Sequence, residues 1–272
     1  MNCDLQKASM MKRVSAWLLD AILFCVLAAG CFWAISAITG YDGHSAKLEE
    51  YYTQYETEFG VTFDFLSLGV DALTEAEREA YNAMTEAEQS AYRESYTQAC
   101  NDAYQAMIAN DDMVYTYNLV LQLTVLMLCI GIFLARLLLD FVVPLLFGNG
   151  QTVGKKIFSL AVMRTGSIRI SAVSLFIRTI LGKYAIETMI PAFIVTMWLL
   201  GIMGIGGTII VAVLMLAQLI LVITTPTNAL IHDKLADTVV VEMSSQMIFH
   251  SQEDKVAYQK MMAAEQADQQ TY

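Results

Sequence analysis

Four charged side chains lie within or beside long apolar segments, where each charge needs a partner or a purpose. Arg13 and Asp20 are seven residues apart, and Arg136 and Asp140 are four apart. Either spacing puts both side chains on one helical face, and the shorter one permits an intrahelical ion pair. These residues are therefore a candidate ion or proton site, in which an aspartate titrates and an arginine modulates its pKa.

An alternative for the same four residues is a neutral ion-pair network that fixes the register of the helices. Both arginines would then extend toward lipid phosphates instead of lining a pathway. The two interpretations differ in whether water reaches Asp20 and Asp140 from the inner face of the membrane.

The segment Gly150-Gln-Thr-Val-Gly-Lys155 has the composition of a phosphate-binding loop but not its spacing. A P-loop needs four residues between its glycines and Ser or Thr after its lysine, whereas this chain has three residues and Lys156. We predict a tight turn beside anionic lipid headgroups instead. The residues assigned to this turn are Gly150, Gln151, Thr152, Gly154 and Lys155.

No pattern in the sequence indicates an enzyme or a metal site. His232 and Asp233 are adjacent, but no Ser or Cys nucleophile accompanies them in a recognisable signature. No Cys or His cluster has metal-ligand spacing, and we expect no cofactor. Cys100 is the only cysteine of its region, so no disulfide is expected within that region.

The composition indicates an integral membrane protein. Hydrophobic residues make up 56% of the 272-residue chain and charged residues 16%, with a mean hydropathy of +0.49. The net charge of -11 is local, because residues 41–117 contain sixteen acidic and three basic side chains. Without a concentrated basic patch, we expect no nucleic-acid partner.

The apolar segments predict an all-α polytopic fold with about four transmembrane helices. The expected parts are an N-terminus with the first transmembrane helix (1–38), an acidic extracytoplasmic helical insert (39–117), a second transmembrane helix (118–147), a basic cytoplasmic loop (148–185), two short transmembrane helices (186–225) and a cytoplasmic tail (226–272). The second helix is too long for the hydrocarbon, so it should tilt, overrun or break near Pro144. The two short helices would form a tight hairpin, with a re-entrant pair as the alternative.

Local patterns add detail to the polar parts. Thr74-Glu-Ala-Glu77 and Thr85-Glu-Ala-Glu88 fit the capping box that starts a helix. An amphipathic stripe is expected from Tyr96, Cys100, Tyr104 and Met107. In the basic loop, residues 157–170 suggest a short hairpin, and residues 171–183 an amphipathic helix whose Arg178 and Lys183 reach lipid headgroups.

Three motifs together resemble the RDD family of bacterial membrane proteins. They are Lys12-Arg13 leading into Leu18-Leu-Asp20, Gly150 to Lys155 with Val162 downstream, and Ile231-His-Asp233-Lys-Leu-Ala236 before Thr238-Val-Val-Val241. The arginine and two aspartates for which the family is named would fall on Arg13, Asp20 and Asp233. Two departures are the acidic insert and Asp237, where the family usually has glycine.

The resemblance implies a multi-pass protein of the bacterial plasma membrane, for which transport is the usual suggestion. The distribution of Lys and Arg places both termini in the cytoplasm. Small-solute or cation/proton transport is the first hypothesis. The second is a non-catalytic scaffold or sensor whose acidic insert binds an outer partner or cations. Anionic lipid headgroups and a second copy of the chain are further expected partners.

Overall fold

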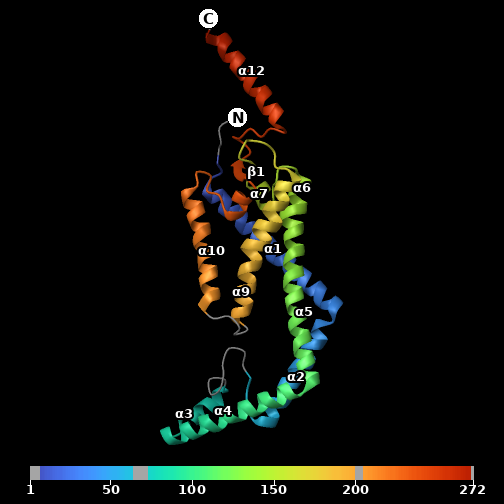
Figure 1. Ribbon diagram of the computed structural model, residues 1–272, viewed down its shortest axis with the longest axis vertical. Helices are drawn as coiled ribbons and strands as arrows, with labels where there is room; N and C mark the ends of the chain where they lie inside the picture. The colour runs from blue at the N-terminus through green and yellow to red at the C-terminus, as the bar shows by residue number, and fades with distance from the viewer. Residues whose placement is uncertain (1–6, 64–72, 200–204, 271–272) are drawn as a thin grey trace. The chain divides into compact units, whose positions relative to one another are not determined.

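A computed structural model describes residues 7–63, 73–199 and 205–270 of the chain. It is 77% helical and has four helices long and apolar enough to cross a membrane. These helices are Met10–Thr39, Asp111–Phe147, Ala172–Trp198 and Gly206–Thr224. The predicted all-α polytopic fold is confirmed (Figure 1).

The elements follow one another with few long connections. In chain order they are α1 (Met10–Thr39), α2 (Tyr41–Phe59), α3 (Glu75–Asn82), α4 (Glu86–Ala109), α5 (Asp111–Arg136), the π-helix η2 (Leu137–Val142), α6 (Val143–Phe147), α7 (Val153–Ile157), β1 (Leu160–Arg164), α8 (Ala172–Phe176), the π-helix η3 (Ile177–Met189), α9 (Ile190–Leu199), α10 (Ile205–Thr224), α11 (Ile231–Leu235), β2 (Thr238–Glu242) and α12 (Gln252–Gln270).

The third membrane helix differs from the prediction for residues 171–203. The expected amphipathic helix and the expected short span are one uninterrupted helix, formed by α8, η3 and α9. Ser171 starts it by accepting a hydrogen bond from the Ser174 N–H at 3.1 Å. Its polar face contacts other parts of the protein, and Arg178 is only 3% exposed. The prediction that this arginine reaches lipid headgroups is therefore wrong. The turn of the predicted tight hairpin between the two short helices falls partly outside the described residues.

The second membrane helix departs from α geometry just before Pro144. Residues 137–142 form η2, and α6 continues the same helix to Phe147. Proline has no N–H, so the carbonyl of Asp140 lacks its usual α-helical partner. The Thr179 hydroxyl donates to that carbonyl at 2.9 Å. A side chain from η3 thus satisfies the backbone group that Pro144 leaves free.

A two-stranded antiparallel sheet joins distant parts of the sequence. β1 pairs with β2, with Leu160 opposite Glu242 and Arg164 opposite Thr238. The expected hairpin is present only as a turn after Arg164 and a single bridge between Met163 and Arg169. Ile168 bridges Phe249 instead. β2 takes the place beside β1, and its valines bury both faces of the sheet.

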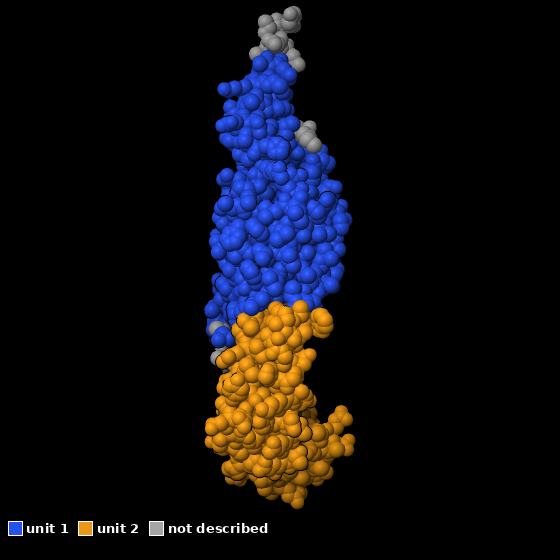
Figure 2. Space-filling view, turned by 90° about the vertical axis from the view of Figure 1, so that its right-hand side faces the viewer, with its two compact units in different colours: residues 1–31, 129–272 blue, residues 32–128 orange. Residues whose placement is uncertain are grey.

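The chain forms two compact units, coloured separately in Figure 2. One comprises residues 1–31 and 129–272, and the other residues 32–128. The second unit has cores of its own. One surrounds Val61, Tyr96 and Ala103, and the other surrounds Tyr55, Met107 and Met113.

Both predicted capping boxes in the second unit are confirmed. The Thr74 and Thr85 hydroxyls accept from the N–H groups of Glu77 and Glu88 at 3.4 Å, and each glutamate accepts from the threonine N–H in return. Of the predicted stripe, Tyr96 and Met107 are buried, but Tyr104 is 56% exposed. The prediction for Tyr104 is wrong, because Ala103 takes the buried position.

Candidate functional site

A cavity of about 550 Å³ lies in the unit formed by residues 1–31 and 129–272. Its walls come from all four candidate membrane spans and from the α7 and α11 segments. Five of its lining side chains are cationic and four are anionic, besides a histidine. The charged ones are Arg13, Asp20, Arg136, Asp140, Lys155, Arg178, Lys183, Glu187 and Asp233, with His232 beside them.

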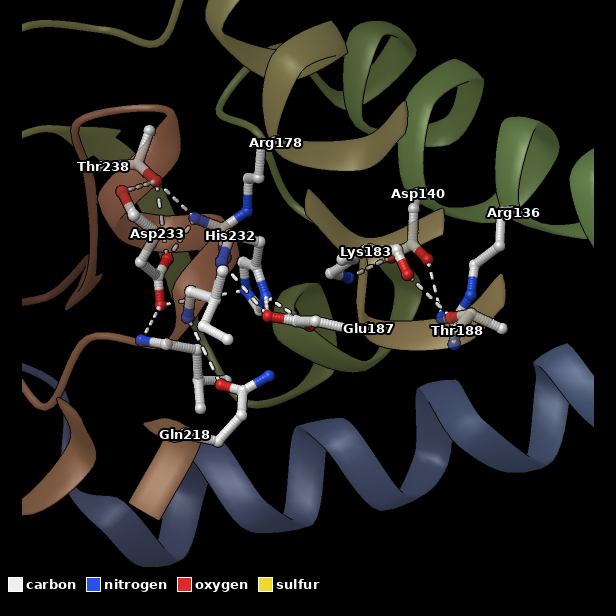
Figure 3. A network of polar contacts seen from close by, with 12 residues as sticks. Arg136, Asp140, Arg178, Lys183, Glu187, Thr188, Gln218, His232, Asp233 and Thr238 are labelled. Carbon is white, nitrogen blue, oxygen red and sulfur yellow. Dashed lines mark hydrogen bonds and ion pairs between the residues drawn. The ribbon is translucent and has the colours of Figure 1, made fainter. Parts of the chain in front are cut away.

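Asp233 is the centre of the first ion-pair network (Figure 3). It lies in the first turn of α11 and accepts a hydrogen bond from the Leu230 N–H at 3.1 Å. Its carboxylate pairs with Arg178, and a guanidinium nitrogen of Arg13 lies 3.6 Å from its other oxygen. Arg178 also donates to the Thr238 hydroxyl. Burial opposes ionisation of Asp233, but Arg178, His232, the Leu230 N–H and Arg13 together outweigh it and hold the pKa below its usual range.

His232 lies between two carboxylates. Its Nδ1 is 2.7 Å from an oxygen of Glu187, and its Nε2 is 3.8 Å from an oxygen of Asp233. The His232 backbone N–H also donates to Glu187 at 3.1 Å. This approach requires Gly182, because a Cβ there would collide with the His232 side chain. Burial lowers the pKa of His232, so the imidazole is neutral over most of the physiological range.

Asp140 is the centre of the second network, also drawn in Figure 3. Arg136 donates to one of its oxygens at 3.0 Å, and Lys183 pairs with the other. The predicted intrahelical pair of Arg136 and Asp140 is therefore present. Arg136 also donates to the Thr188 hydroxyl at 3.3 Å and lies over the Phe24 ring, 4.1 Å from its centroid. Its buried Nε has no hydrogen-bond partner among the described residues.

Both networks lie beside π-helical turns. Asp140 is in η2, whereas Arg178, Lys183 and Glu187 are in η3. π-Helical segments are rare and occur frequently at functional sites. Here the wider turns help to place one carboxylate from η2 and one cation from η3 in contact.

Asp20 joins α1 to the predicted loop motif. It accepts from the Thr152 hydroxyl and, at 2.8 Å, from the Gly154 N–H. A Cβ on Gly154 would strike the Ala16 carbonyl and the Asp20 carboxylate, so α7 packs on α1 only with glycine there. Gly150 has a positive φ of 61° and turns the chain into this contact. The glycines are thus needed for close packing within the protein.

The central residues of this loop pack within the protein. Gln151, Thr152 and Gly154 are buried. The Gln151 amide donates to the Leu160 carbonyl at 2.6 Å. Lys155 lines the cavity, whereas Lys156 is exposed and lies 3.8 Å from the Phe147 ring centroid.

Lys155 differs from the other cations of the cavity. Its Nζ donates to the Thr152 hydroxyl at 3.3 Å, but no carboxylate of a described residue lies within ion-pair distance. Burial, followed by repulsion from Lys183 and Arg178, lowers the pKa of Lys155 to about 7. The amine therefore changes its charge near neutral pH.

The four residues predicted as an ion or proton site, Arg13, Asp20, Arg136 and Asp140, line the same cavity, and so does Asp233 of the family motif. They do not form one cluster. Arg13 and Asp20, which share one helical face, do not pair with each other. Arg13 pairs with Asp233, and Asp20 accepts hydrogen bonds from the α7 loop. The loop supplies an N–H and a hydroxyl, which satisfy a carboxylate without a second charge.

Sequence reasoning missed the contribution of the third membrane helix. Arg178 and Lys183 were expected at lipid headgroups, and Glu187 was not singled out, yet all three line the cavity. Their steps of five and four residues are the signal, because a helix with π turns brings such positions onto one face. No group of three or more metal-ligating side chains occurs in the parts of the chain that the structure describes.

Comparison with known proteins gives one match. A model of the RDD family matches residues 7–237. No curated protein and no solved structure matches the chain.

Proposed function

The chain belongs to the RDD family, and from this premise we propose that it is a transporter. It moves a small ion or polar solute through the charged cavity and exchanges protons as it does so. The observation that carries this proposal is the cavity itself, because nine charged side chains line it and most of them belong to candidate membrane spans. Charges at such positions are costly unless they pair or line a pathway.

The arrangement of the pairs supports transport over a purely structural network. A network that only fixes helix register needs no cavity, and a buried ion pair repays its desolvation only when its remaining hydrogen-bonding groups are satisfied. Here the two networks around Asp140 and Asp233 border an open volume, and Lys155 faces it with a pKa near neutrality. A group of this kind takes up and releases protons at physiological pH.

Flux measurements in proteoliposomes test the proposal. Wild-type protein, Asp20→Asn and Asp237→Asn are compared for movement of protons, Na⁺ and K⁺. Asp237 is the matched control, because its carboxylate is exposed and lies outside the cavity lining. We expect flux in wild type and Asp237→Asn and a loss of at least tenfold in Asp20→Asn. Equal flux in all three and in empty liposomes would overturn the proposal.

We further propose that the protein lies in the bacterial plasma membrane with both termini in the cytoplasm. The supporting pattern is the placement of basic residues before the first span and after the second, with the acidic insert between them.

Cysteine labelling tests this orientation. Ser90 and Ser244 are exposed, so each is replaced by cysteine in a background that lacks the native cysteines. A membrane-impermeant maleimide added to whole cells should label the cysteine at position 90 but not the one at 244 until the cells are opened. The reverse pattern would invert the topology.

A second candidate function is a membrane scaffold whose acidic insert binds a partner or cations. It is favoured by the separate cores of residues 32–128 and by the net charge of the insert. Deletion of residues 42–112 followed by crosslinking in cells should remove specific partners. An unchanged set of crosslinked partners would count against this role.

A further inference from the structure

The positive charges of the cavity outnumber the carboxylates that could balance them. The Asp140 carboxylate is shared by two cations, Arg136 and Lys183. Lys155 also lies near enough to Asp140 to interact with it electrostatically. One carboxylate therefore faces three cationic side chains in this part of the cavity.

The remaining carboxylates are not free to balance this excess. Asp233 is likewise shared by Arg13 and Arg178. The oxygens of Asp20 accept from Thr152 and Gly154.

Glu187 is occupied in the same way. Its carboxylate contacts the His232 ring at 2.7 Å and accepts from the His232 backbone N–H. Each carboxylate that lines the cavity thus has its own set of donors, and none is left for Lys155.

Two nitrogen atoms are left without an acceptor that matches their chemistry. The buried Nε of Arg136 has no hydrogen-bond partner among the described residues, and Lys155 has only a hydroxyl. A buried donor without an acceptor is destabilising, and a buried ammonium without a counterion more so. Both residues line the cavity, whose volume of about 550 Å³ is in the range of small-molecule sites.

We propose that the cavity binds an oxyanion of the phosphate class among Arg136, Lys155 and Lys183. Guanidinium and ammonium groups are the side chains that bind such anions, by directed hydrogen bonds and by charge respectively. The source is either a free anion or the phosphate of a lipid headgroup, which present the same oxygens. The inference that this anion is the transported solute rests on the proposed function. The inference that the cavity binds it does not.

The site also predicts a pH dependence. Lys155 must be protonated to hold the anion, and the groups that face it are Lys183 and Arg178 from η3, Asp140 from η2 and Asp20 from α1. Affinity should be highest below pH 7 and fall as the pH rises through 7 toward 8. Replacement by arginine keeps the charge, so Lys155→Arg should remove this dependence.

Binding is measured by calorimetric titration of the purified full-length protein in a neutral detergent. The probe is inorganic sulfate, a tetrahedral oxyanion whose charge is constant between pH 6 and 8, at an ionic strength fixed with chloride. We expect Lys155→Gln to weaken sulfate binding at least tenfold. The matched control is Lys156→Gln, the adjacent but exposed lysine, which should bind as wild type does.

Lipid discs separate the two sources of the anion. Thermal unfolding is compared in discs of phosphatidylglycerol and of a galactolipid, whose headgroup has no phosphate. If sulfate binds with the expected dependence on Lys155, the site accepts a free anion. If sulfate does not bind but phosphatidylglycerol raises the unfolding temperature of wild type and Lys156→Gln, and not of Lys155→Gln, the headgroup is the ligand. Both outcomes support the site.

Two outcomes would overturn it: no effect of either probe on the wild type, or equal losses in Lys155→Gln and Lys156→Gln. Lys155→Arg guards against misfolding of the glutamine variant, because it keeps the charge and should retain binding at pH 8. Flux without anion binding would remove this inference and leave the transport proposal standing. Anion binding without flux would remove the transport proposal and leave this inference standing.

Discussion

Asp237 occupies a backbone conformation that favours glycine. Its φ is +51°, in the left-handed region, which aspartate tolerates better than most residues. The Thr165 hydroxyl donates to its carboxylate at 2.7 Å, and Arg164 lies 3.7 Å away. The turn between α11 and β2 is thus kept although the family's usual glycine is replaced.

This conformation predicts different effects of two substitutions at position 237. Asp237→Gly should leave the free energy of unfolding within about 0.5 kcal/mol of wild type, because relief of the backbone offsets the lost contacts. Asp237→Val should destabilise by about 1–3 kcal/mol, because a β-branched residue fits poorly at positive φ. Chemical denaturation in detergent measures both. Equal stability of the valine and glycine variants would contradict the assignment.

Lys155 predicts a dependence of stability on pH. Its pKa of about 7 in the folded protein is below its ordinary value of 10.5, so the unfolded chain binds a proton that the folded chain releases. Stability should therefore rise as the pH increases from about 7 toward 10, by up to about 1.4 kcal/mol per pH unit, and be flat with respect to this group below 7.

Denaturation curves at several pH values in chloride test this dependence. Lys155→Met should lack the increase between pH 7 and 10 that wild type shows. Lys156→Met is the control, because its side chain is exposed and should leave the slope unchanged. Parallel pH profiles for wild type and Lys155→Met would show that this lysine keeps its ordinary pKa.

At the scale of elements, signals that are local in sequence predicted most of the fold. Both capping boxes and the apolar segments follow from residues a few positions apart. The pairing of β1 with β2 does not, because the two strands lie more than seventy residues apart and each has only five residues. The π-helices were not predicted either, and the five-residue step from Arg178 to Lys183 is the local sign of η3.

The restriction of sequence signals to nearby residues also explains the outcome for the candidate site. Apolar context identified Arg136 and Asp140, and spacing within one helix predicted their ion pair. The partners of Arg13 and Asp20 come from α11 and α7, which no spacing rule connects to α1. Sequence reasoning therefore found residues of the cavity but not the way in which they pair.

The hydrogen bond from Thr179 of η3 to the Asp140 carbonyl of η2 gives a prediction for these two helices. Thr179→Val should destabilise the protein by about 1–3 kcal/mol, because it leaves a buried carbonyl without a donor. The loss should shrink in the background Pro144→Ala, where a backbone N–H becomes available at that position.

A double-mutant cycle of unfolding free energies measures this coupling. Thr196→Val is the control, since the Thr196 hydroxyl donates only within its own helix, to the Ala192 carbonyl. Its effect should be small and independent of Pro144→Ala. Additive effects of Thr179→Val and Pro144→Ala would mean that proline and threonine are not linked through this carbonyl.

At the scale of the whole molecule, the division into two units could be expected from charge and hydropathy alone. The acidic residues are concentrated in 41–117, and the apolar segments flank them. The separate cores of residues 32–128 could not be expected in detail, because buried aromatic side chains from α2 and α4 build them. Separate cores imply that each unit can lose stability without the other.

The capping boxes provide the test of this independence. Thr74→Ala with Thr85→Ala removes both side-chain caps and should lower the stability of α3 and α4 by about 1 kcal/mol per cap. Hydrogen exchange followed by mass spectrometry should then show faster exchange in residues 75–109 and unchanged exchange in β1, β2 and η3.

Gly154→Ala is the converse variant, because it disturbs the contact between α7 and α1. It should speed exchange around the cavity and leave α3 and α4 as in wild type, since Ala16 and Asp20, which a Cβ on Gly154 would meet, belong to the unit of residues 1–31 and 129–272. Faster exchange throughout the chain in either variant would show that the two cores unfold as one.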